Sequence, residues 1–237
     1  MVGKRANVSE SLRALGVAVG LLIAGLAVSV VFGVVFTVPL VLFGPAVGSP
    51  GGFLVLAAAG QLAFLAVGYL YVRRHEGVRV RWPTRRDVRY MVGGLVVTLV
   101  AALGLSVLFA SLGLAPEGSV FEDPITADPR VALGLAALSV VLVAPAEELL
   151  FRGAIQGRLR RSFGPAVAIA LSSLVFGSIH LLNFTGSVVG ALTGVAVVTV
   201  GGVVFGTIYE RTGNLLVPIV THGSYNALLL VATFLTV

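Results

Sequence analysis

Residues 91–114 read MVGGLVVTLVAALGLSVLFASLGL and contain no charged side chain. A helix of about 20 consecutive apolar residues is long enough to cross the hydrocarbon core of a bilayer. Runs of this kind occur seven times, at about residues 14–43, 52–72, 91–114, 131–151, 165–182, 187–208 and 214–236. The sequence therefore predicts an all-α fold, a polytopic membrane helical bundle of about seven transmembrane helices.

The composition supports a lipid-exposed surface. Of the 237 residues, 57% are hydrophobic and 11% are charged, whereas a soluble domain carries about 25% charged residues. We therefore expect a multi-pass protein of the cell membrane. Lys4, Arg5 and Arg13 precede the first run, as in a signal peptide. That run is much longer than the roughly 7–15 apolar residues of a signal peptide, so we interpret it as a retained span.

The net charge of +6 is divided between alternate loops and is not typical of a nucleic-acid-binding surface. Arginines and lysines gather at the N-terminus, between the second and third runs, after the fourth run and between the sixth and seventh. The remaining loops contain mainly carboxylates: Glu117, Glu122, Asp123 and Asp128, with Arg130 as their basic residue. The positive-inside rule then predicts a cytoplasmic N-terminus and an external C-terminus. Membrane lipid is an expected partner, including anionic headgroups at residues 73–89, and nucleic acid is not.

Ionisable side chains at membrane depth are costly and usually face the bundle interior or a wet cavity. Here they are Glu147, Glu148, His180 and His222, joined by the amide of Asn226. The first three runs contain no such charged group. We therefore expect one site, built between the last four helices.

The first part of this site contains Glu148 and Arg152, which are four residues apart on one helical face in the favourable order for an ion pair. The pair either ends the fourth span at the surface or lies inside the bundle. Residues 154–162 still suit a helix, which places both glutamates roughly 22 Å from its cytoplasmic end. A regular helical hairpin that turns at residues 163 and 164 places Glu147 level with His180.

The other polar residues lie on two later helices. Phe176 precedes His180 by one turn and either lines the site or packs in the core. His222 and Asn226 are four residues apart and share a face. They suit either an oxyanion hole or a polar contact between helices. Regular helices place His222 closer to the cytoplasmic side than Glu147.

Two features outside these helices predict packing. Gln61 is the main polar residue of the first three runs, and a lone glutamine usually makes an interhelical hydrogen bond. The sixth run carries glycines at small-xxx-small spacing, which allows helices to approach closely: Gly186, Gly190, Gly194, Gly202 and Gly206.

A buried carboxylate next to a histidine is able to deprotonate a water molecule. A second histidine with an asparagine is suited to stabilise the oxyanion that forms when this water attacks an amide. The chain has no cysteine, and no Ser/His/Asp or Ser/Lys arrangement stands out. Peptide hydrolysis with a glutamate base is the simplest interpretation.

The three segments resemble the motifs of the CAAX protease and bacteriocin-processing family, also called the Abi family, which includes the Ras-converting CAAX prenyl endopeptidases. The family pattern Glu-Glu-x-x-x-Arg is matched by Glu147, Glu148 and Arg152. Phe-x-x-x-His is matched by Phe176 and His180, and a late His with Asn or Asp four residues later is matched by His222 and Asn226. The resemblance covers roughly residues 130–230.

The resemblance implies roles for these residues. Glu147 is expected to be the general base, and His180 to help hold the attacking water. The oxyanion site is assigned to His222 and Asn226, with Glu148 and Arg152 in support. On this interpretation, residues 1–237 form a single integral membrane domain, in which spans one to three (residues 1–130) precede a catalytic core of spans four to seven (residues 131–237).

Three alternatives remain at this point. In a zinc-dependent version of the protease, Glu147, His180 and His222 are the metal ligands; we favour a mechanism without a metal or other cofactor. In the second alternative the chain is a non-catalytic membrane scaffold or immunity protein. In the third it is a proton-coupled transporter. The expected substrate is a peptide or protein, with or without a lipid modification, that reaches the site from the cytoplasm or sideways from the lipid.

Overall fold

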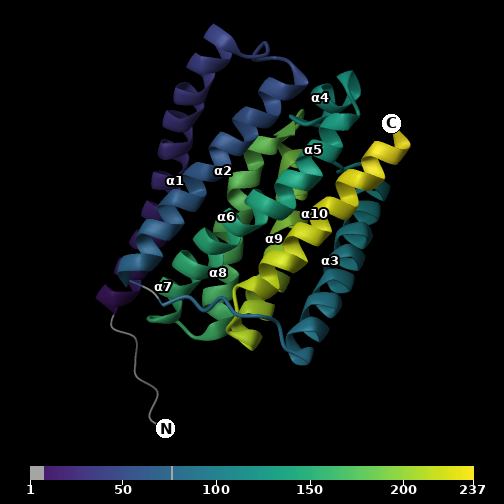
Figure 1. The fold of residues 1–237 in the computed structure, drawn as a ribbon. Helices are drawn as coiled ribbons and strands as arrows, with labels where there is room; N and C mark the ends of the chain where they lie inside the picture. The colour runs from purple at the N-terminus through teal and green to yellow at the C-terminus, as the bar shows by residue number, and fades with distance from the viewer. Residues whose placement is uncertain (1–7, 76) are drawn as a thin grey trace.

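The computed structural model describes residues 8–75 and 77–237 and is a bundle of long helices (Figure 1). Lys4 and Arg5 lie outside the described residues. Within those residues, seven helices are long and apolar enough to cross a membrane: Val8–Phe43, Pro50–His75, Arg85–Ser111, Arg130–Arg160, Pro165–Asn183, Val188–Thr212 and Leu216–Thr236. The predicted all-α, multi-pass fold is confirmed, and the seven predicted runs each correspond to one of these helices.

Six of the spans consist of one principal α-helix each: α1 (Val8–Phe43), α2 (Pro50–His75), α3 (Arg85–Ser111), α8 (Pro165–Ile179), α9 (Val188–Thr212) and α10 (Leu216–Thr236). The fifth span extends beyond α8 through the short 3₁₀ helix η3 (His180–Asn183). Between α3 and the fourth span, α4 (Glu122–Ala127) follows strand β1 (Gly118–Ser119), which pairs antiparallel with β2 (Phe184–Thr185). This small sheet joins the end of η3 to the segment that follows α3.

The fourth span is continuous but irregular. It contains α5 (Arg130–Leu138), the π-helix η1 (Ser139–Val143), α6 (Ala144–Glu148), the π-helix η2 (Leu149–Gln156) and α7 (Gly157–Arg160). Pro145 has no N–H and cannot make the usual bond to the carbonyl four residues earlier, and the N–H of Ala144 bonds to Ser139, five residues earlier. Short π-helices occur often at functional sites. Here they flank the two adjacent glutamates.

This irregular span lies at the centre of the bundle. It packs against α2, α8 and α10, while α1 packs outside α2, and α3 packs on α9 and α10. In the most apolar stretch of 18 residues, 44% of the residues are buried in the fourth span, compared with 11% in α1 and 11% in α3. The main apolar core joins α1, α2, the fourth span and α8 through residues such as Phe64, Phe151 and Phe176. The glutamates are therefore enclosed by protein and shielded from lipid.

The glycines of α9 allow close packing, as predicted. A Cβ atom on Gly202 would lie 3.0 Å from the Phe176 ring, and one on Gly194 would lie 2.3 Å from the Phe184 ring. Gly186 is an exception to the prediction, because it lies before α9 in a turn with φ of +90° and does not belong to the helical stripe. That backbone conformation favours glycine.

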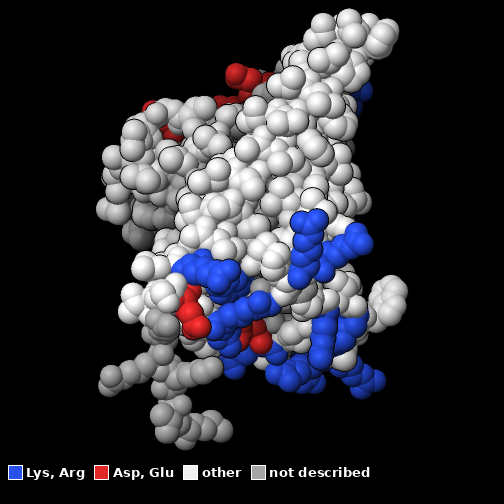
Figure 2. All heavy atoms as spheres, turned by 90° about the vertical axis from the view of Figure 1, so that its left-hand side faces the viewer, with Lys and Arg blue, Asp and Glu red and all other residues white. Residues whose placement is uncertain are grey.

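Charge is divided between the two ends of the bundle. Figure 2 shows Lys and Arg side chains gathered near the lower end of the molecule, where α2 ends and α7 ends in the view of Figure 1. The ends of α4 and α5 that carry Asp123, Asp128 and Arg130 lie at the opposite end. This division agrees with the loop pattern used above, and the cytoplasmic position of the arginine-rich end stays a prediction.

Candidate active site

Glu148 forms the best-connected part of the polar cluster. Its side chain is fully buried, and its Oε2 accepts a hydrogen bond from Nε of Arg152 at 3.0 Å. Its Oε1 lies 3.0 Å from Nδ1 of His222. Arg152 is also fully buried, with its guanidinium carbon 5.0 Å from the centroid of the Phe176 ring. The predicted Glu148–Arg152 pair is thus present inside the bundle and does not end the span at the surface.

Glu147 is held differently from its neighbour. Its Oε1 accepts a hydrogen bond from Nε2 of Gln61 on α2 at 3.0 Å. Its Oε2 is buried and has no hydrogen-bond partner among the described residues, and it lies 3.9 Å from Nε2 of His222. One carboxylate oxygen is therefore fixed while the other remains available for a reacting group.

His180 lies where α8 ends and η3 begins. Its Nδ1 is 2.8 Å from the carbonyl oxygen of Phe176, and because that oxygen only accepts, Nδ1 must carry the proton. The Nε2 atom of neutral His180 is then an acceptor. The ring lies 4.7 Å from the Phe176 ring and is close enough to Glu147 and His222 for electrostatic interaction. Phe176 therefore borders the polar cluster and also packs in the apolar core, so both roles considered from the sequence are present.

His222 is enclosed by aromatic rings. Phe205 of α9 stacks on it at 4.7 Å between centroids, and Phe176 meets it edge-on at 5.8 Å. The His222 imidazole contacts Glu148 at 3.0 Å and lies 3.9 Å from Glu147, so the difference in depth expected from regular helices does not separate these side chains. The π-helix η2 uses more residues per turn than an α-helix, which brings Glu147 nearer to the end of the bundle where α10 begins.

Asn226 is one turn after His222 on α10 and is half-buried. The structure gives its side-chain amide no hydrogen bond to the described residues. His222 and Asn226 lie on the same face of α10, as their spacing predicts. The Asn226 amide is therefore free to contact a bound group. The geometry brings together a buried carboxylate, two histidines and an amide from three different spans.

Comparison with known proteins identifies the segment that holds this cluster. Residues 129–228 match the family model described as type II CAAX prenyl endopeptidase Rce1-like. These residues form an Rce1-like domain. The match agrees with the resemblance seen in the three motifs, and it includes Glu147, His180, His222 and Asn226. No curated protein and no solved structure matches the chain.

The seven apolar helices make this chain a multi-pass membrane protein, and residues 129–228, which match a protease family model, include four of its spans. Gln61 lies outside the matched residues, yet it contacts Glu147 directly. The predicted interhelical bond of Gln61 is therefore present. The expectation that the first three spans stay outside the site is wrong, because a long polar side chain reaches it from α2.

Two further residues near the Rce1-like site had no distinguishing signal in the sequence. Phe205 stacks on His222, although a phenylalanine in an apolar span predicts only core packing. Gln156 is fully buried and donates to the Gly206 carbonyl at 3.1 Å, which joins the fourth span to α9. A search for long amides in the apolar runs finds Gln61 only, because Gln156 lies after the fourth run and close to Arg158, Arg160 and Arg161.

The donor set of the Rce1-like domain does not form a metal site in this arrangement. Within residues 8–75 and 77–237, no group of three or more His, Cys, Asp or Glu side chains is arranged to hold a metal ion. Nδ1 of His222 faces Glu148, and Nδ1 of His180 faces the Phe176 carbonyl. These contacts engage one nitrogen of each histidine and leave both Nε2 atoms available, so the choice between the metal-free and the zinc-dependent reaction rests on the chelator experiment described below.

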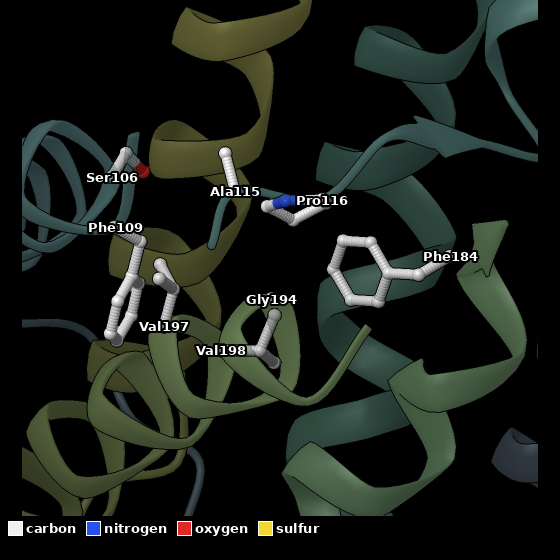
Figure 3. A pocket seen from close by; sticks show the side chains of 8 residues that line it. All are labelled: Ser106, Phe109, Ala115, Pro116, Phe184, Gly194, Val197 and Val198. Carbon is white, nitrogen blue, oxygen red and sulfur yellow. The ribbon is translucent and has the colours of Figure 1, made fainter. Parts of the chain in front are cut away.

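An apolar pocket of about 170 Å³ is lined by α3, the segment that follows it, β2 and α9 (Figure 3). Phe109 of α3 and Phe184 of β2 lie on opposite sides of it, and Val197 of α9 lines it between them. None of the polar site residues contributes to its wall. It is a separate feature from the cluster of polar residues around Glu147.

Proposed function

We propose that this chain is an intramembrane endopeptidase that hydrolyses a peptide bond with a water molecule activated by Glu147. The observation that carries the proposal is a difference in hydrogen bonding between two adjacent glutamates. Glu148 has both oxygens engaged by Arg152 and His222, whereas Glu147 has a buried oxygen without a partner. A general base needs an oxygen that is free to take a proton, so Glu147 is the base and Glu148 supports the site.

The reaction begins with a water molecule between Glu147 and His180. Nε2 of neutral His180 accepts one hydrogen bond from this water and orients it. Glu147 Oε2 removes the other proton as the water oxygen attacks the carbonyl carbon of the substrate. The C–N bond then breaks, and Glu147 returns the proton to the leaving nitrogen. The products are a carboxylic acid and an amine, so atoms and protons balance.

The oxyanion that forms in this step is stabilised by His222 and Asn226. Nδ1 of His222 faces a carboxylate and therefore carries a proton, so a neutral His222 has no proton at Nε2 to donate. Donation to the oxyanion requires the doubly protonated ring. The charge of this ring also balances Glu147, since Arg152 already balances Glu148, and a buried charge is costly when it is unpaired. The oxyanion is therefore stabilised by one cationic donor, His222, and one neutral donor, Asn226.

Three residues position these groups without touching the substrate. Gln61 holds Oε1 of Glu147, so that Oε2 is directed toward His222. Glu148 and Arg152 hold His222 through a buried, hydrogen-bonded ion pair. We propose that residues 131–237 form the catalytic core and that residues 1–130 support it, with Gln61 as the direct link.

The proposed substrate is a peptide or protein that reaches a site within the membrane, with or without a lipid modification. The Rce1-like family supports a substrate of this class. We propose that no metal or other cofactor takes part in the reaction.

The test is cleavage of a quenched fluorescent peptide library by the purified protein in detergent, with and without a strong zinc chelator. Turnover that persists in the chelator, with one ¹⁸O atom from labelled water in the new carboxylate, supports the proposal. Turnover lost in chelator and restored by zinc supports the metal version instead. If the protein binds library peptides and cleaves none of them, the chain is a scaffold. If vesicles that contain the protein show a proton flux across the membrane, the chain is a transporter.

A further inference from the structure

The segment 77–84 connects α2 to α3 at the arginine-rich end of the bundle and contains no helix or strand. It presents apolar side chains outward: Trp82 is 91% exposed and Val80 is 63% exposed. Tryptophan in membrane proteins is enriched at the boundary between lipid and water, because its ring is apolar and its N–H is polar. The exposure of Trp82 at this end of a membrane bundle therefore indicates contact with the bilayer surface.

The segment is fixed to the start of α10. The buried Asn214 side chain accepts from the Arg81 N–H at 3.2 Å and donates to the Arg81 carbonyl at 3.0 Å. The N–H of Leu215 donates to the Arg79 carbonyl at 2.9 Å. The Arg81 side chain also pairs with Asp87 at 2.5 Å. These bonds on both sides of the chain set the position of Trp82, so the exposed ring is a feature of the fold.

Exposed arginines surround the same segment. Each is exposed, and none forms an ion pair within the described part of the chain: Arg73, Arg74, Arg79, Arg85 and Arg89. Two carboxylates among the described residues at this end are already engaged, since Asp87 pairs with Arg81 and Glu210 pairs with Arg160. Figure 2 shows this end of the molecule as predominantly basic. The arginines therefore offer their charge to anions from outside the protein.

We propose that Trp82 and the arginines around segment 77–84 form a binding surface for anionic phospholipid headgroups. The arginines contact the phosphates, and the Trp82 ring lies among the headgroups. A bilayer is favoured over a soluble acidic partner because α2 ends and α3 begins here, which places the segment at the lipid–water boundary. Val80 and Trp82 then contact lipid, whereas a soluble acidic partner would leave these apolar side chains without a role.

The chain contains one tryptophan, so its tryptophan fluorescence reports on Trp82 alone. The full-length protein is reconstituted in vesicles of phosphatidylcholine with a minor fraction of phosphatidylglycerol. Bromine atoms, which quench tryptophan on contact, are carried on either lipid at the same total bromine content. Each arginine near an anionic surface contributes roughly a fivefold preference. We expect brominated phosphatidylglycerol to quench at least about threefold more strongly than brominated phosphatidylcholine.

Two matched variants test the role of the arginines. Arg79→Gln with Arg85→Gln removes two charges beside Trp82, and we expect the preference for brominated phosphatidylglycerol to fall below that of the wild type. Arg13→Gln with Arg158→Gln removes two charges from α1 and α7 at the same end, and the wild-type preference should persist. Equal quenching in the wild type, or a preference that is unchanged in the first variant, overturns the proposal. A spectral change produced only by a soluble acidic peptide overturns it in favour of a protein partner.

Discussion

The contact between Gln61 and Glu147 gives a sharp test of how the site is organised. Gln61→Met keeps the length of the side chain and removes the hydrogen bond to Oε1 of Glu147, which measures 3.0 Å in the wild type. The carboxylate is then free to rotate away from the position in which Oε2 faces His222. We expect a large loss of activity with a small loss of stability.

The expected losses of activity and of stability follow from the energy of the hydrogen bond between Gln61 and Glu147. A hydrogen bond to a charged group contributes about 1.5–3 kcal/mol. If this energy serves to orient the base, its loss lowers kcat/KM by about 10- to 150-fold. A hydrogen bond between membrane helices contributes on average only about 0.6 kcal/mol to folding. A residue that only packs would therefore change Tm slightly and leave kcat close to its wild-type value.

The assay compares kcat, KM and Tm for the wild type, Gln61→Met and Ser29→Ala. Ser29→Ala is the matched control, because its hydroxyl donates to the Gly60 carbonyl at 3.2 Å and also joins α1 to α2 beside Gln61, without contact with Glu147. The reasoning predicts that kcat falls in Gln61→Met alone. A wild-type kcat in Gln61→Met, or an equal decrease in both variants, would refute it.

Three further predictions concern other parts of the site. Glu148→Gln leaves Arg152 buried without its carboxylate and should lower the free energy of unfolding by about 3–5 kcal/mol; adding Arg152→Met should recover part of this loss in denaturant titrations. Gly202→Ala should lower Tm, because its Cβ would lie 3.0 Å from the Phe176 ring, whereas Gly201→Ala, whose nearest neighbour would be at 3.6 Å, should not. Asn226→Ala should lower kcat by about 100- to 1000-fold in steady-state peptide cleavage, with KM within about twofold of the wild type.

The features that follow from composition and helical spacing were predictable from the sequence. Seven spans follow from apolar length, and the Glu148–Arg152 pair follows from a four-residue spacing. The placement of Glu147 and His180 around one site followed from the length of the helices on either side of a turn. These inferences use distances along the chain that a regular helix fixes.

Features that depend on departures from a regular helix, or on distant partners, were not predictable. The π-helices on either side of Glu147 depart from the regular spacing that was used to estimate its depth relative to His222. The partner of Gln61 lies 86 residues away along the chain, and no spacing rule connects them. The proton positions on His180 and His222 depend on which atoms face them, so they required the three-dimensional arrangement.

The central claim is that Glu147 is the general base, and Glu147→Gln tests it most directly. Glutamine keeps the shape of the side chain and cannot take the proton from water. We expect kcat for peptide cleavage to fall by about 100- to 10,000-fold, while Tm stays close to that of the wild type and peptide binding persists. A Glu147→Gln protein that folds and cleaves peptide at a rate near that of the wild type would contradict the account.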